Sequence, residues 1–154
     1  MLKLRKSLLI LAIALFGSTL VGTMPAGASP GPRSATGVGC TTAFSYAFRG
    51  ITIRVPGTCL HHSIHGSGRT VRQDTSFFAV SGGFPRACNW RIDYDYYNTS
   101  NVRYRHYVGP VHTGCNSIGS RTIYPGTLPS YGRGCARLYI NGILKVSQCH
   151  YITS

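Results

Sequence analysis

The chain of 154 residues contains almost no acidic side chains. Glutamate is absent, and three aspartates stand against sixteen lysines and arginines, which gives a formal net charge of +13. This scarcity argues against glycosidase chemistry, which usually needs two carboxylates in different protonation states. Asp93 and Asp95 are two residues apart, and we expect neighbouring arginines to keep both ionised, which disfavours an acid role. Asp74 is close in sequence to Arg69 and Arg72, and we expect a surface ion pair there.

The cysteines lack the close spacing of a metal site. No two of the six form a C-x-x-C pair, so we predict neither a zinc site nor another metal site, and no cofactor. An even number of cysteines in an exported chain instead predicts three disulfides. Spacing alone does not choose among the pairings, and our working expectation joins neighbours in sequence: Cys40 with Cys59, Cys88 with Cys115, and Cys135 with Cys149.

Long apolar runs are missing after residue 28, which argues against a transmembrane segment in the processed chain. Residues 1–28 themselves have the form of a secretory signal peptide, with a cationic start, an apolar run and an Ala26-Gly27-Ala28 cleavage site. Cleavage there would remove three of the cations and lower the net charge from +13 to +10. We therefore expect a secreted, extracellular protein, with residues 29–39 as a flexible leader and residues 40–154 as a single β domain.

Sustained helical periodicity is also missing. Short alternating segments recur instead between turns rich in glycine and proline, which is typical of strands. The sequence thus predicts an all-β fold, a small antiparallel β-sandwich or barrel stapled by disulfides. Gly50 marks either a bend within one strand or a turn between two short strands.

The last segment, residues 135–152, predicts a hairpin around Asn141-Gly142, because a type I′ turn needs positive φ at both positions. A strict two-residue loop would place Cys135 opposite Gln148 rather than Cys149. Either the turn is longer, or the expected Cys135–Cys149 disulfide is wrong.

The stretch from Cys88 to Tyr107 predicts a central hairpin. If Tyr97 pairs with Arg103, one face of the hairpin is apolar and the other is charged, whereas a one-residue slip mixes the two sets. The preferred register turns Trp90, Ile92 and Tyr94 inward. It also places Asp95 opposite Arg105 and Asp93 opposite Tyr107.

The outward face of this hairpin is a candidate binding surface. Tyrosine and arginine anchor many interfaces and stack on bases or sugar rings. An alternative interpretation is a structural ladder in which these arginines stack on tyrosines and pair with the aspartates. The candidate binding residues are Arg91, Tyr97, Arg103, Arg105 and Tyr107.

The histidines offer a second kind of candidate site. His61, His62 and His65 form H-H-x-x-H without the glutamate of zinc proteases, and on a strand His61 and His65 would lie about 13 Å apart, too far for one metal. A ribonuclease-like mechanism needs two imidazoles, as base and acid, and a cation for the phosphate. The weak catalytic candidates for this reaction are His61, His65, His106 and His150.

Three features together resemble a known group of proteins: the signal peptide, the CNWRIDY strand and the closing segment GCARLYINGILKVSQCHYI. They are similar to the small secreted cysteine-containing proteins of Streptomyces and other actinomycetes. The resemblance implies export, a bacterial source and a disulfide-bonded β domain. That group brings no activity that can be carried over, so the resemblance assigns no site residue.

The arginine-rich balance points to an anionic partner. Arginine outnumbers lysine thirteen to three, and guanidinium forks suit phosphate, sulfate and carboxylate groups. We expect a secreted, basic, non-catalytic β domain that binds an anionic polymer or the cell-wall surface, with nucleic acid and membrane surface as further anionic classes. The alternative is a secreted phosphodiesterase or ribonuclease-like toxin that uses paired histidines.

Overall fold

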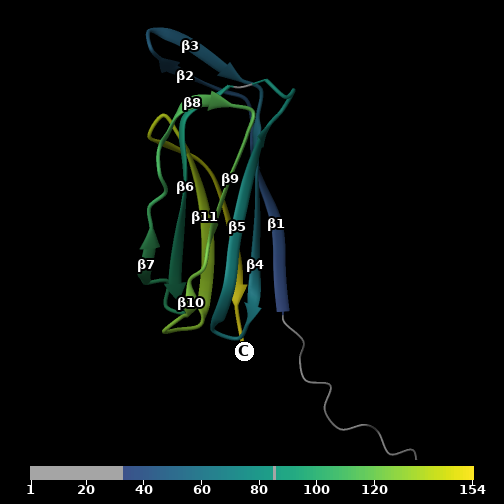
Figure 1. Cartoon of the computed structure of the whole chain (residues 1–154), viewed down its shortest axis with the longest axis vertical. Helices are drawn as coiled ribbons and strands as arrows, with labels where there is room; N and C mark the ends of the chain where they lie inside the picture. The colour runs from purple at the N-terminus through teal and green to yellow at the C-terminus, as the bar shows by residue number, and fades with distance from the viewer. Residues whose placement is uncertain (1–32, 85) are drawn as a thin grey trace, which may run out of the picture.

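The protein is a two-layered β structure with a hairpin projecting from one end (Figure 1). The computed structural model describes residues 33–84 and 86–154, so the expected signal peptide lies outside the described residues. Both layers are antiparallel sheets, and the all-β prediction is confirmed in its sandwich form. Within the described residues, no helix has the length and apolar character needed to cross a membrane.

The first sheet has the order β1-β4-β5-β10, and β9 also pairs with β5. Its strands are β1 (Arg33–Thr41), β4 (Thr58–Ser67), β5 (Thr70–Val80), β9 (Ile118–Ile123) and β10 (Gly126–Thr127). The prediction of a flexible leader is wrong for residues 33–39, because they belong to β1 and pair with residues 60–66 of β4. The small residues that looked like a leader are compatible with an extended edge strand.

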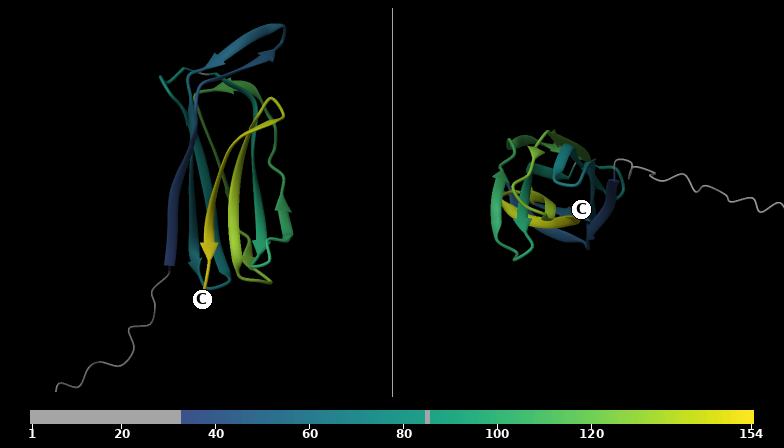
Figure 2. Two further views of the ribbon diagram at one scale, coloured as in Figure 1. Left: turned by 180° about the vertical axis from the view of Figure 1, so that it is seen from behind. Right: turned by 90° about the horizontal axis from the view of Figure 1, so that it is seen from below.

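The second sheet has the order β12-β11-β6-β7, and β8 also pairs with β6. Its strands are β6 (Ala87–Asn98), β7 (Arg103–Tyr107), β8 (His112–Asn116), β11 (Gly132–Ile140) and β12 (Ile143–Ile152). The view from below in Figure 2 shows the strands of the two sheets arranged around a common interior.

The projecting hairpin consists of β2 (Phe44–Phe48) and β3 (Ile51–Val55). Arg49 and Gly50 both have positive φ and form the tight turn between them. Of the two interpretations of Gly50, the turn between two short strands is therefore the observed one. Tyr46 and Val55 of this hairpin are buried against the end of the sandwich.

The core lies between the sheets and is centred on β6. Trp90, Ile92 and Tyr94 are all buried, as predicted, and the Trp90 side chain is only 4% exposed. The ring of Phe78 from β5 packs edge-on against Trp90, with ring centroids 4.9 Å apart. The alternating apolar residues of β6 therefore do face the core between the sheets.

Three disulfides join directly opposed residues of neighbouring strands. They link Cys40 to Cys59, Cys88 to Cys115, and Cys135 to Cys149, and each pair is also a strand-pairing partner. The expected pairing of neighbours in sequence is confirmed. Loops of this length are worth about 3 kcal/mol each when closed by a disulfide, in the chain-entropy account.

A β-bulge reconciles the last hairpin with its disulfide. Asn141 and Gly142 have φ of 50° and 78° and form the two-residue turn, with Ile140 opposite Ile143. Lys145 is then an extra residue in β12, because Leu138 pairs with Val146. This insertion shifts the register by one and places Cys135 opposite Cys149. Neither of the two expected outcomes holds, since both the short turn and the disulfide are present.

A second bulge changes the predicted register of the central hairpin. Tyr97 pairs with Arg103 as expected, but Tyr96 pairs with Arg105, so Tyr104 is an extra residue in β7. Beyond the bulge, Asp95 therefore lies opposite His106, and the predicted Asp95–Arg105 pair is wrong. The predicted pair of Asp93 with Tyr107 is also wrong, because Tyr107 lies opposite Tyr94.

A strand glycine provides a test of the core packing. A Cβ atom built on Gly119 of β9 would lie 2.5 Å from both Phe78 and Trp90, whereas one on Gly114 of β8 would meet nothing within 4 Å. We expect Gly119→Ala to lower the free energy of unfolding by about 1–3 kcal/mol through overpacking. Gly114→Ala, the control, should change it little. Urea unfolding of both variants measures this, and equal effects would contradict the described packing.

Candidate functional site

The three aspartates, which are the only acidic side chains of the chain, are all buried. Asp74 and Asp95 are fully inaccessible, and Asp93 is 1% exposed. The predicted surface ion pair of Asp74 with Arg69 and Arg72 is therefore wrong. Because no carboxylate side chain reaches the surface, every exposed charged side chain in the described residues is cationic.

Asp74 points inward because of a third bulge. His65 pairs with Gln73, whereas Gly66 pairs with Val71, so Arg72 is an extra residue in β5. Val71 on one side of the bulge and Asp74 on the other consequently both face the interior. This change of phase also explains why neither face of this strand alternates cleanly in the sequence.

Asp74 belongs to a buried polar cluster that joins the two sheets. Its Oδ1 lies 2.8 Å from Nε2 of His62 in β4, and its Oδ2 accepts a hydrogen bond from the hydroxyl of Tyr96 in β6. Nδ1 of His62 donates to the backbone carbonyl of Gln148, 3.0 Å away. Both ring nitrogens of His62 thus face oxygen atoms, one from each sheet.

The other two aspartates lie under arginines on the outer face of the second sheet. Nε of Arg91 is 3.1 Å from Asp93, whose other oxygen accepts a hydrogen bond from the Gly109 amide. Asp95 contacts Nδ1 of His106 at 2.6 Å and Nη1 of Arg103 at 3.2 Å. As expected, both carboxylates have arginine partners, and neither is arranged as a general acid.

Arginines and tyrosines alternate across this outer face, which we call the arginine–tyrosine face. The guanidinium of Arg91 lies 4.4 Å from the ring centroid of Tyr139, and those of Arg133 and Arg137 lie 4.7 and 5.8 Å from that of Tyr97. Its residues are Arg91, Tyr97, Arg103, Arg133, Arg137 and Tyr139. The alternative interpretation of this surface, a ladder of arginines that stack on tyrosines and pair with aspartates, is therefore confirmed.

The arginine–tyrosine face includes three of the five candidate binding residues. Arg91, Tyr97 and Arg103 lie on it. Arg105 and Tyr107 do not, because the bulge in β7 pairs them with the inward residues of β6. Arg105 instead donates to the carbonyl of Pro125, 3.1 Å away.

Two further arginines of this face, Arg133 and Arg137, were not predicted from the sequence. Both belong to β11, which is distant in sequence from the central hairpin but pairs with β6. Nε of Arg137 lies 3.1 Å from Asp95. Burial opposes its charge, but Asp95 and the neighbouring tyrosine oxygens together raise the pKa of Arg137.

The catalytic candidates among the histidines lie in separate places. His61 stacks on Phe77, with ring centroids 4.3 Å apart, and Nδ1 of His65 lies 3.0 Å from the Ser34 hydroxyl. His106 contacts Asp95, as described above. Neither of the two described cavities is lined by a histidine.

His150 is the candidate that approaches another histidine. Its ring centroid lies 4.9 Å from that of His62, but His62 is fully buried and cannot reach a substrate. Burial lowers the pKa of His150, although its hydrogen bond to the His62 carbonyl works in the opposite direction. The described contacts therefore leave only the half-buried His150 of this pair accessible from outside.

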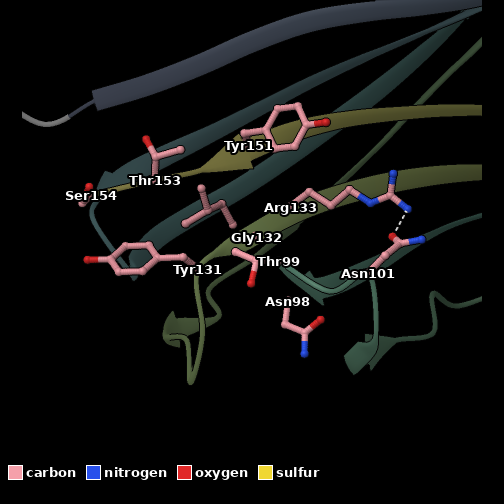
Figure 3. A pocket seen from close by; sticks show the side chains of 10 residues that line it. Asn98, Thr99, Asn101, Tyr131, Gly132, Arg133, Tyr151, Thr153 and Ser154 are labelled. Carbon is pink, nitrogen blue, oxygen red and sulfur yellow. Dashed lines mark hydrogen bonds between the residues drawn. The ribbon is translucent and has the colours of Figure 1, made fainter.

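A cavity of about 500 Å³ opens where the β6–β7 turn, the start of β11 and the end of β12 meet. Figure 3 shows two separate tyrosine rings, Tyr131 and Tyr151, and the guanidinium of Arg133 reaching Asn101. Because Arg133 also belongs to the arginine–tyrosine face, the cavity lies at one end of that face.

Comparison of the chain with protein-family models, with curated proteins and with solved structures found no match. The functional inference therefore rests on the residues and their geometry.

Removing the hydroxyl of Tyr96 tests the buried cluster. We expect Tyr96→Phe to lower the free energy of unfolding by about 2–3 kcal/mol, because the buried carboxylate of Asp74 loses a charge-assisted hydrogen bond. Tyr104→Phe is the matched control, since its hydroxyl bonds the neutral carbonyl of Ser130 in a part-buried position. In denaturant unfolding, Tyr96→Phe should have a clearly lower free energy of unfolding than the control. The reverse order would contradict the described hydrogen bond to Asp74.

Alkaline pH gives a second test. Burial raises the pKa of Tyr94 and Tyr96, so the folded state keeps both protons at pH values where the unfolded chain loses them. Their contribution to stability is complete below about pH 10 and falls above it by about 1.4 kcal/mol per pH unit for each tyrosine. Unfolding measured from pH 9 to higher values should show a shallower decline for Tyr96→Phe than for the native chain. Equal slopes would contradict the assignment.

Proposed function

We propose that this protein is a secreted, non-catalytic domain that binds an anionic polysaccharide through its arginine–tyrosine face. The observation that carries the proposal is the burial of all three carboxylate side chains. With the acids inside and the arginines outside, the protein presents an exclusively cationic set of charged side chains, which attracts polyanions from every side.

The face itself favours an oriented contact over a diffuse one. Arg91, Arg103 and Arg137 have side chains 30%, 49% and 26% exposed above the buried carboxylates. A guanidinium has five N–H donors, and one bond to aspartate leaves donors for a ligand. Stacking on Tyr97 and Tyr139 holds the planar groups in place, which lowers the entropy lost on binding.

Two features compatible with export support an extracellular partner for this face. Three disulfides suit an oxidising compartment, and the amino-terminal residues have the pattern of a signal peptide. Acidic polymers of the cell wall or surface are the anions available in that location.

Retention on a heparin column at increasing salt tests this function. We expect the native chain to be retained and its elution to depend steeply on salt. Arg103→Gln should elute at clearly lower salt, whereas Arg72→Gln, which removes one exposed charge from a strand of the other sheet, should elute close to the native chain. Near-ultraviolet circular dichroism should confirm that both variants are folded.

Two results would contradict the proposal. If Arg103→Gln and Arg72→Gln elute together, net charge rather than the arginine–tyrosine face governs retention. If the native chain is not retained even at low salt, the cationic surface has no polyanion partner of this kind.

A further inference from the structure

The cavity beside Arg133 has a neighbour at the same end of the sandwich. A second, smaller cavity of about 80 Å³ lies next to it and is lined by residues of β1, β4 and β5. Both cavities share Tyr151, Ile152 and Thr153. The carboxyl-terminal end of β12 therefore borders both cavities, one toward each sheet.

Two exposed tyrosines give the larger cavity flat apolar surfaces. The side chain of Tyr151 is 81% exposed and that of Tyr131 is 38% exposed, although most tyrosines of the second sheet are packed inside. A cavity of about 500 Å³ is within the range of small-ligand sites, which combine apolar surface with a few polar groups. An exposed aromatic face of this kind suits the C–H face of a sugar ring.

The polar residues of the cavity both donate and accept hydrogen bonds. Asn98 and Asn101 bring side-chain amides, and Thr99 and Thr153 bring hydroxyls. Such groups match sugar hydroxyls, which also act as donor and acceptor. A nucleic-acid groove relies on cations along the backbone and on stacked bases, so this mixture favours a sugar.

An arginine whose side chain is fixed by neighbouring residues, Arg133, gives the cavity a preference for an anion. The Arg133 guanidinium lies over Tyr97 and donates to Asn101, and its fork suits a carboxylate. Arg69 is a second cation close by, 5.9 Å from the ring centroid of Tyr131. No acidic side chain lines either cavity in the described residues, but Ser154, the last residue of the sequence, also lines the larger cavity.

We propose that this cavity binds one acidic sugar ring of the polysaccharide, stacked on Tyr151 and paired through its carboxylate with Arg133. The inference rests on the proposed function and adds a specific sugar-binding subsite to it. The arginine–tyrosine face supplies the general attraction, and the cavity recognises a single uronic acid unit.

Calorimetric titration with trigalacturonic acid tests the subsite, with its methyl ester as the neutral probe of the same shape. Any affinity tag is kept away from the carboxyl end, because Thr153 and Ser154 line the cavity. The native chain should bind the acid and bind the ester more weakly by about tenfold or more. Tyr151→Ala should lower the affinity for the acid by about tenfold, and Arg133→Lys by a similar factor.

Tyr124→Ala is the matched control, because Tyr124 is 75% exposed and lies outside both cavities. It should leave binding of the acid unchanged, and Tyr151→Ala should still elute from heparin near the native chain. Equal losses in Tyr124→Ala and Tyr151→Ala, equal binding of acid and ester, or tighter binding of a thymidine trinucleotide would overturn the subsite.

The two proposals fail in different ways. If the native chain is retained on heparin but does not bind trigalacturonic acid, the subsite is refuted and the polyanion-binding function stands. If heparin retention is also missing, both are refuted.

Discussion

The fold depends on a buried carboxylate held between two sheets. Asp74 from β5 accepts a hydrogen bond from Tyr96 of the opposite sheet and contacts His62 of its own sheet, and His62 in turn bonds the backbone of β12. A charge in such a place is costly unless every partner is present. The sheets therefore have one relative position in which these groups are satisfied, and the apolar contacts around Trp90 are made in that same position.

The strands and disulfides could be predicted because they depend on local signals. Alternation along β6 identified its buried face, Asn141-Gly142 identified the turn, and neighbouring cysteines became cross-strand partners. The errors in side-chain facing arise at bulges, whereas the misjudged leader is a strand of small residues without an apolar pattern. An extra residue in β5, β7 or β12 reverses the alternation for the rest of the strand, and a period of two carries no sign of where that residue lies.

The site was less predictable than the fold for the same kind of reason. The arginine excess pointed to an anion, and the hairpin supplied half of the arginine–tyrosine face. Arg133 and Arg137 join that face only because β11 pairs with β6, and the cavity unites segments near residues 98, 131 and 152. The spacing of residues along the chain does not indicate which distant segments will lie side by side. Asp74, predicted at the surface, is instead buried like Asp93 and Asp95, so the exposed charged side chains are cationic.

The approach of β1 to β12 affects how the protein avoids self-association. These are the edge strands of the two sheets on one side, and a Cβ on Gly37 of β1 would lie 2.5 Å from the Gln148 side chain and 2.9 Å from His150. Two bare glycines, Gly37 and Gly39, let one edge shield the other. An unshielded edge is a template on which a further chain can add as a strand. This mutual cover of the two edge strands therefore protects against fibrous aggregation.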